Sequence, residues 1–190
     1  SGVTSVQAGT LALSGTLSNS AVTVQSGGTL AGNGFIGSSL TILSGGTLSP
    51  GNSPGKIQTN TLTLNAGSTT VMEIVGVTSG THSLPGTAGT NYDTLVVDAA
   101  GGLTYGGALS IVFSNAYSFA NDDSFDLFGL SGTPSGHFGS IASTGSGLYA
   151  GLTFTGLSGI WTAATLTGDQ LLTFTESTGR LVVSQAVPEI

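Results

Sequence analysis

The sequence predicts an all-β protein, a single-stranded right-handed parallel β-helix or solenoid, from a repeat and from a strand-like alternation. Apolar residues recur at 18-residue intervals, at Val6, Val24 and Ile42. Within the repeats apolar residues alternate with Thr or Ser, which is the two-residue period of a half-buried strand. No segment shows a convincing helical period longer than two turns. One turn of such a repeat cannot bury its apolar face alone, so successive turns are expected to stack.

Three close copies of one motif and a looser fourth lie in the N-terminal part of the chain. They read SVQAGTL (5–11), TVQSGGTL (23–30), TILSGGTL (41–48) and LTLNAGST (62–69). Each predicts a short strand, a bend at Gly-Gly or Ala-Gly, and a second strand beginning near Thr-Leu or its counterpart.

Stacking places like residues over like. Two inward ladders are expected, formed by Val6, Val24, Ile42 and Leu64 and by Leu11, Leu30 and Leu48. An outward row is expected at Thr23, Thr41 and Thr63, with Thr29 and Thr47 on a second row. A β-sandwich or meander is the alternative, although no Asn-Gly or Asp-Gly hairpin turn separates the matched strands.

Residues 1–75 are predicted to form regular coils, and residues 76–190 a less regular continuation of the same solenoid. This second part carries an aromatic-rich core or cap, with Phe113, Phe119, Phe125, Phe128, Phe138, Phe154 and Trp161. Between two coils, SPGNSPG (49–55) is interpreted as a corner, because Pro fixes φ and Gly permits positive φ. It is expected outside the stack and outside any ligand pocket.

Charge excludes several classes of partner. The formal net charge is −7, and Lys56 and Arg180 are the only basic residues. A nucleic-acid-binding surface needs clustered cations, as does attraction to an anionic membrane, so neither partner is expected.

No apolar run reaches the roughly 18–20 residues of a membrane span. With Cys 0, disulfides and thiolate chemistry are excluded. Because the chain opens at Ser1 without a signal-peptide pattern, a mature or excised segment is expected.

The densest acidic group is NDDSFD, where Asp122, Asp123 and Asp126 are candidate Ca²⁺ ligands. The alternative, which the lack of an EF-hand pattern favours, is a polar turn whose side chains cap backbone amides. His82 and His137 are interpreted as solvated loop residues. No catalytic residue and no cofactor is predicted, and Ca²⁺ is the one metal considered.

LSGGTLSPGNSPGKI (43–57) resembles the autotransporter-associated β-strand repeat of bacterial secreted surface proteins, and NYDTLVVDAAGGLTYGGALSIVF (91–113) is similar to the segment that closes such repeat regions. The final AVPEI (186–190) resembles the start of a Val-Pro-Glu-Pro (PEP-CTERM) sorting signal, with Ile190 at the position of the second proline.

The resemblance implies an extracellular bacterial structural protein of the cell surface or matrix, and not an enzyme. Self-assembly into fibres by end-to-end stacking or strand exchange, adhesion, and contact with surface glycans are the expected interactions. The alternative is a carbohydrate-active β-helix enzyme of the lyase or glycosidase type. Such an enzyme needs converging carboxylates, whereas Asp93 and Asp98 lie five residues apart.

Overall fold

The computed structural model describes residues 2–79, 82–100, 102–114 and 118–186, and these residues contain strands but no helix. Within this part of the chain, then, nothing helical has the length and hydropathy to cross a membrane. Two large sheets, of nine and six strands, are parallel throughout. The nine-stranded sheet contains β1 (Val3–Val6), β3 (Thr16–Leu17), β4 (Ala21–Val24), β6 (Phe35–Ile42), β8 (Lys56–Leu64), β12 (Thr94–Val97), β13 (Leu103–Tyr105), β16 (Phe128–Leu130) and β17 (Ser135–Gly136). The six-stranded sheet contains β2 (Gly9–Leu13), β5 (Gly28–Gly32), β7 (Thr47–Pro50), β9 (Thr69–Ile74), β14 (Ala108–Phe113) and β18 (Ser140–Gly145).

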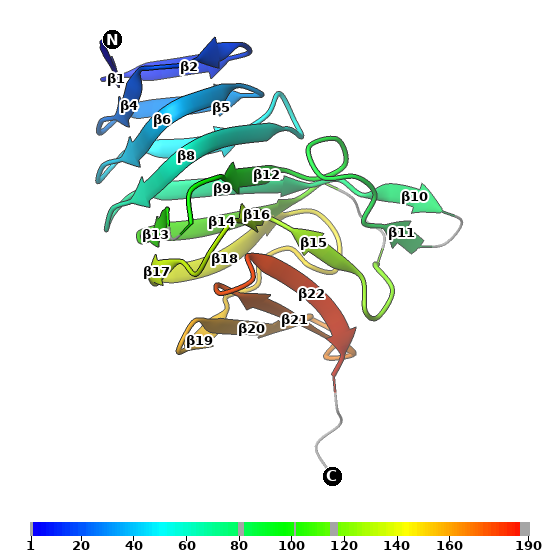
Figure 1. The fold of residues 1–190 in the computed structure, drawn as a ribbon. Helices are drawn as coiled ribbons and strands as arrows, with labels where there is room; N and C mark the ends of the chain where they lie inside the picture. Colours follow the sequence, from blue (N-terminus) through cyan, green and yellow to red (C-terminus); the bar gives the residue numbers. More distant parts are fainter. Residues whose placement is uncertain (1, 80–81, 101, 115–117, 187–190) are drawn as a thin grey trace.

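The chain passes alternately through the two sheets, and each return adds one layer (Figure 1). We number the layers from the N-terminus as residues 3–13, 16–32, 35–50, 56–74, 94–113 and 128–145. Every pairing between adjacent layers within these sheets is parallel. The fold is therefore all-β, with parallel sheets built from sequential layers.

The predicted ladders are confirmed by the register. Val6 pairs with Val24, Val24 with Ile42 and Ile42 with Leu64. The second ladder runs from Leu11 through Leu30 to Leu48, and the structure extends it through Thr70 and Leu109 to Ile141. The outward row of Thr23, Thr41 and Thr63 is also confirmed. Alternation along each strand sends one set of side chains into the core between the sheets and the other set outward.

The Gly bends of successive layers lie over one another, as the strands do. Gly27, Gly45 and Gly67 all have positive φ, near +80°, which side chains disfavour. The Gly27 N–H donates to Gly45 O at 2.9 Å, and the Gly45 N–H donates to Gly67 O at 2.8 Å. The corners are thus hydrogen-bonded from layer to layer, which explains why Gly recurs at this position of the repeat.

Parallel layers continue beyond residue 75, through β14 and β18, and a different arrangement follows. A five-stranded antiparallel sheet has the order β15 (Ser124–Asp126), β22 (Arg180–Gln185), β21 (Gln170–Thr175), β20 (Ile160–Ala164) and β19 (Thr155–Leu157). In Figure 1 β19–β22 lie below β18, at the end of the stack away from the N-terminus, and β15 lies beside β18. A hairpin of β10 (Val77–Ser79) and β11 (His82–Leu84) projects sideways between layers 4 and 5.

Aromatic side chains fill the C-terminal part of the core. All six of the predicted Phe residues are buried, whereas Trp161 is partly buried. Tyr105 of layer 5 packs edge-on against Phe128 of layer 6, with ring centroids 5.3 Å apart. Phe128 in turn contacts Phe174 of the antiparallel sheet, at 6.0 Å. Large rings therefore join the parallel layers to the antiparallel sheet.

Candidate functional site

The most elaborate polar site surrounds Glu176, the residue after β21. Its side chain is only 4% exposed, although it sits in the turn that leads into β22. The Glu176 N–H donates to Gly159 O at 2.9 Å, which links this turn to the β19–β20 turn. A carboxylate held so far from water requires partners, because an unpaired buried charge is strongly unfavourable.

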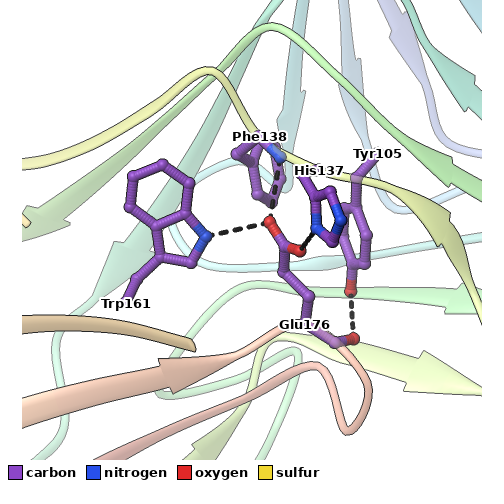
Figure 2. A network of polar contacts seen from close by, with 5 residues as sticks. All are labelled: Tyr105, His137, Phe138, Trp161 and Glu176. Carbon is purple, nitrogen blue, oxygen red and sulfur yellow. Dashed lines mark hydrogen bonds and ion pairs between the residues drawn. The ribbon is translucent and has the colours of Figure 1, made fainter. Parts of the chain in front are cut away.

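Three N–H groups supply those partners, and Figure 2 shows them converging on the carboxylate. The Phe138 backbone N–H and Trp161 Nε1–H both donate to Oε1 at 2.9 Å. His137 Nδ1 lies 2.6 Å from Oε2. Since a carboxylate only accepts hydrogen bonds, Nδ1 carries the proton of this contact. Glu176 thereby joins the antiparallel sheet to the loop between β17 and β18.

Tyr105, at the end of β13, completes the network from layer 5. Its hydroxyl donates to the backbone O of Glu176 at 3.0 Å. Burial raises the pKa of Tyr105, so the hydroxyl keeps its proton and remains a donor. Layers 5 and 6 and the antiparallel sheet are therefore all tied at one residue.

A hollow of about 200 Å³ opens beside His137 and Glu176. The His137 side chain is 66% exposed, so the prediction of a solvated loop histidine is right about exposure. The contact between His137 and Glu176 was not predicted. A carboxylate that orients one imidazole nitrogen leaves the other available for hydrogen bonding or proton transfer. This arrangement can bind a polar ligand at the surface.

The second polar site holds the SPGNSPG segment (49–55), whose position differs from the predicted one. Ser49 and Pro50 belong to β7, and the Gly51 N–H donates to Gly32 O at 2.7 Å, within the wall of the stack. The segment also lines a hollow of about 330 Å³ together with Glu73 and Asp93. The prediction that it lies outside the stack is therefore wrong for Ser49–Gly51, whereas Asn52 and Ser53 are exposed. Its role as a corner between layers 3 and 4 is confirmed by its place between β7 and β8.

Asp93 holds this corner from inside. It is 1% exposed, and its two carboxylate oxygens accept the Gly55 N–H at 2.6 Å and the Glu73 N–H at 2.8 Å. Burial raises its pKa to about 7, against the two N–H contacts, which favour the carboxylate. Gly55 has no room for a side chain, because a Cβ there would lie 1.8 Å from Asn33 Oδ1. The same Cβ would lie 2.2 Å from Gly51 Cα, so two backbone segments pass close together at this corner, and the buried Asp93 holds them in place.

Glu73, beside Asp93, accepts hydrogen bonds from the Ser53 and Ser114 hydroxyls. Two carboxyl groups thus border one hollow, as an acid-catalysed glycoside cleavage would require. Both oxygens of Asp93 are already engaged by backbone N–H groups, however, which fits a structural role. Asp98, the other carboxylate considered from the sequence, is exposed and accepts from Gln58 Nε2 at 2.8 Å.

The three aspartates considered for Ca²⁺ make different contacts. Asp123 Oδ2 accepts the Ala120 N–H at 2.8 Å, and Asp126 Oδ1 accepts Arg180 Nε–H at 2.7 Å. The Asp122 N–H donates to Val183 O at 2.7 Å, with φ of 72°. In the part of the chain that the structure describes, no group of three or more His, Cys, Asp or Glu residues is placed to hold a metal ion. Asp123 caps a backbone amide, as the turn interpretation expects, whereas Asp126 lies in β15 and pairs with Arg180.

His82 lies in β11 of the side hairpin, in a strand and not a loop. Residues 187–190, most of the segment that resembles a sorting signal, lie outside the described residues. The roles of Glu176 and Asp93 were not predicted. Each is a single acid in a Thr- or Gly-rich segment, and only the burial of its position distinguishes it from the exposed acids.

Comparisons with protein-family models, with curated proteins and with solved structures found no match to this chain.

Proposed function

We propose that this chain is a structural element of an extracellular bacterial surface or matrix protein, folded as a single right-handed β-helix. The observation that carries the proposal is the register, which continues from layer to layer through both parallel sheets. Strand–crossover–parallel strand connections are right-handed in nearly all proteins, which supports the handedness. The resemblance of residues 43–57 to autotransporter-associated repeats supports the surface location.

The two ends of the stack suggest how it assembles. At the N-terminal end, β1 pairs with β4 and β2 with β5, each on one side only, within the described sheets. At the other end, residues 151–154 cover the outer edge of β18, where the Phe154 N–H donates to Ile141 O at 2.9 Å. A strand edge with free N–H and C=O groups readily pairs with another chain. For this chain by itself, β1 and β2 would pair with the same strands of a second copy, and the segment over β18 would oppose pairing at the far edge of the six-stranded sheet.

Sedimentation velocity over a range of concentrations tests this assembly. We expect a monomer–dimer equilibrium, which the change Ser5→Lys in β1 shifts toward monomer because a charge on an edge strand opposes pairing. Thr41→Lys is the matched control, since Thr41 lies on the same outward row but within the stack. A chain that stays monomeric at every concentration contradicts the assembly. An antibody against the chain that labels only permeabilised source cells contradicts the surface location.

A further inference from the structure

The hollow beside His137 has features that the structural role leaves unexplained. Three turns or loops meet there, those between β17 and β18, between β19 and β20, and between β21 and β22. Its floor is fixed, because Glu176 holds the loop of His137 and the strand of Trp161 at once. Gly159 lies so close that a Cβ there would come 2.9 Å from Glu176 Oε2. The hollow is thus a preformed feature of the closed end of the stack.

His137 supplies an oriented polar group. The contact of Nδ1 with Glu176 fixes the ring and its tautomer, so that Nε2 is the hydrogen-bond acceptor of the neutral imidazole. The hydroxyl residues Ser158, Thr175 and Ser177 line the same hollow. Hydroxyls both donate and accept hydrogen bonds, as do the hydroxyls of a ligand.

The charges at the hollow favour a neutral ligand. Glu176 is the one carboxylate in the lining, and its oxygens already accept two N–H groups and contact His137. Neither basic residue of the chain, Lys56 or Arg180, is part of the lining, so an anion would find no fixed cation. Hydrogen bonding and apolar contact are what this surface offers.

An apolar wall completes the hollow. Ile160 is 51% exposed, although it begins a strand of the antiparallel sheet, and Pro134 lies on the lining as well. A sugar ring has this same combination of an apolar C–H face and a rim of hydroxyls. The volume is below the roughly 300–1,000 Å³ of pockets for drug-sized molecules, which fits a single ring.

We propose that this hollow binds one sugar residue of a neutral glycan, with His137 and the hydroxyl residues around it making the hydrogen bonds and Ile160 contacting the ring. The site would let a structural stack adhere to a polysaccharide. It does not depend on self-association, so sugar binding and dimerisation succeed or fail separately.

Trp161 provides the readout, because it is the only Trp of the chain and its Nε1–H donates to the same carboxylate that holds His137. The probes are the methyl glycosides of glucose, galactose, mannose and N-acetylglucosamine, titrated while Trp fluorescence is followed. We expect a saturable change with at least one glycoside and a Kd of about 1 mM, typical of weak recognition by few contacts. His137→Ala should weaken binding about tenfold or more, whereas His82→Ala, at the other histidine, should leave it unchanged.

A second variant keeps the test decisive if His137→Ala disturbs folding. The double change Ser177→Ala with Ile160→Thr alters the lining but touches none of the side-chain contacts of Glu176, and it should also weaken binding. Absence of a saturable change with all four glycosides overturns the proposal. Equal affinity in the wild type and the lining variants, which places binding elsewhere, overturns it as well.

Discussion

Layers 2–4 and the C-terminal antiparallel sheet bury their core side chains in different ways. In the layers, aliphatic side chains such as Leu30 and Leu48 stack in register, and Gly corners bond to each other from layer to layer. At the antiparallel sheet, rings and a buried carboxylate replace the ladder, with Phe174 and Glu176 as central residues. A repeat can extend a stack but cannot end it, because every layer exposes the edge that the next one needs. The end therefore requires residues that break the pattern.

The largest expected effect is inside the stack, at layer 2. Leu30→Ala removes a side chain that is fully buried in layer 2 and should lower the free energy of unfolding by about 3–4 kcal/mol, as large-to-small core changes do. Leu11→Ala removes the equivalent side chain of layer 1, which is only partly buried, and should cost less than half as much. Urea denaturation followed by Trp fluorescence measures both. Equal losses would mean that layer 1 is as well covered as layer 2.

A comparable loss is expected at the closed end. Glu176→Ala leaves the Phe138 N–H and Trp161 Nε1–H without their acceptor, and should cost about 2–3 kcal/mol, since each unpaired buried donor costs about 1–3 kcal/mol. Asp98→Asn, at an exposed carboxylate, is the control and should change stability little. Denaturation with intrinsic fluorescence and hydrogen exchange of β20–β22 measures the effect. A loss of protection confined to the layers, and not the antiparallel sheet, contradicts this role of Glu176.

The corner between layers 3 and 4 predicts a pH-dependent effect. Burial raises the pKa of Asp93 to about 7 in the folded protein, from 3.8 for an unperturbed Asp. Between these values the folded state binds more protons than the unfolded state, so stability falls as pH rises. The contribution is fully present below pH 3.8 and is lost as pH passes 7. Glu73 is the charged group beside Asp93 and adds to the rise of its pKa.

The measurement is the free energy of unfolding from pH 4 to pH 8, in the wild type and in Asp93→Asn. The variant should lack the fall in stability that Asp93 contributes between about pH 4 and pH 7, because its amide does not titrate. Identical profiles for the two proteins would show that Asp93 stays ionised throughout, held by the Gly55 and Glu73 N–H groups.

The smallest expected effect is an increase in the free energy of unfolding. Thr70 occupies the inward ladder between Leu48 and Leu109, and among the described residues its buried hydroxyl has no hydrogen-bond partner. Thr70→Val keeps the shape and removes the unpaired group, and should stabilise the protein by about 1 kcal/mol. Thr63→Val, on the outward row of layer 4, is the matched control and should change stability by less than that. Thermal unfolding compares the two variants, and destabilisation by Thr70→Val would show that the hydroxyl has a partner after all.

The sequence alone determined the repeat, its inward ladders and its Gly corners. These features depend on residues that are 18 apart and on local backbone conformation, so a single chain displays them directly. It also indicated that the aromatic residues gather in the C-terminal core. Only the tertiary structure decided where the stack ends, that Ser49–Gly51 lie in its wall, and that Glu176 meets His137 and Trp161. Those contacts join segments 15 to 71 residues apart without a repeated spacing. The burial that makes a lone acid important exists only once the chain has folded around it.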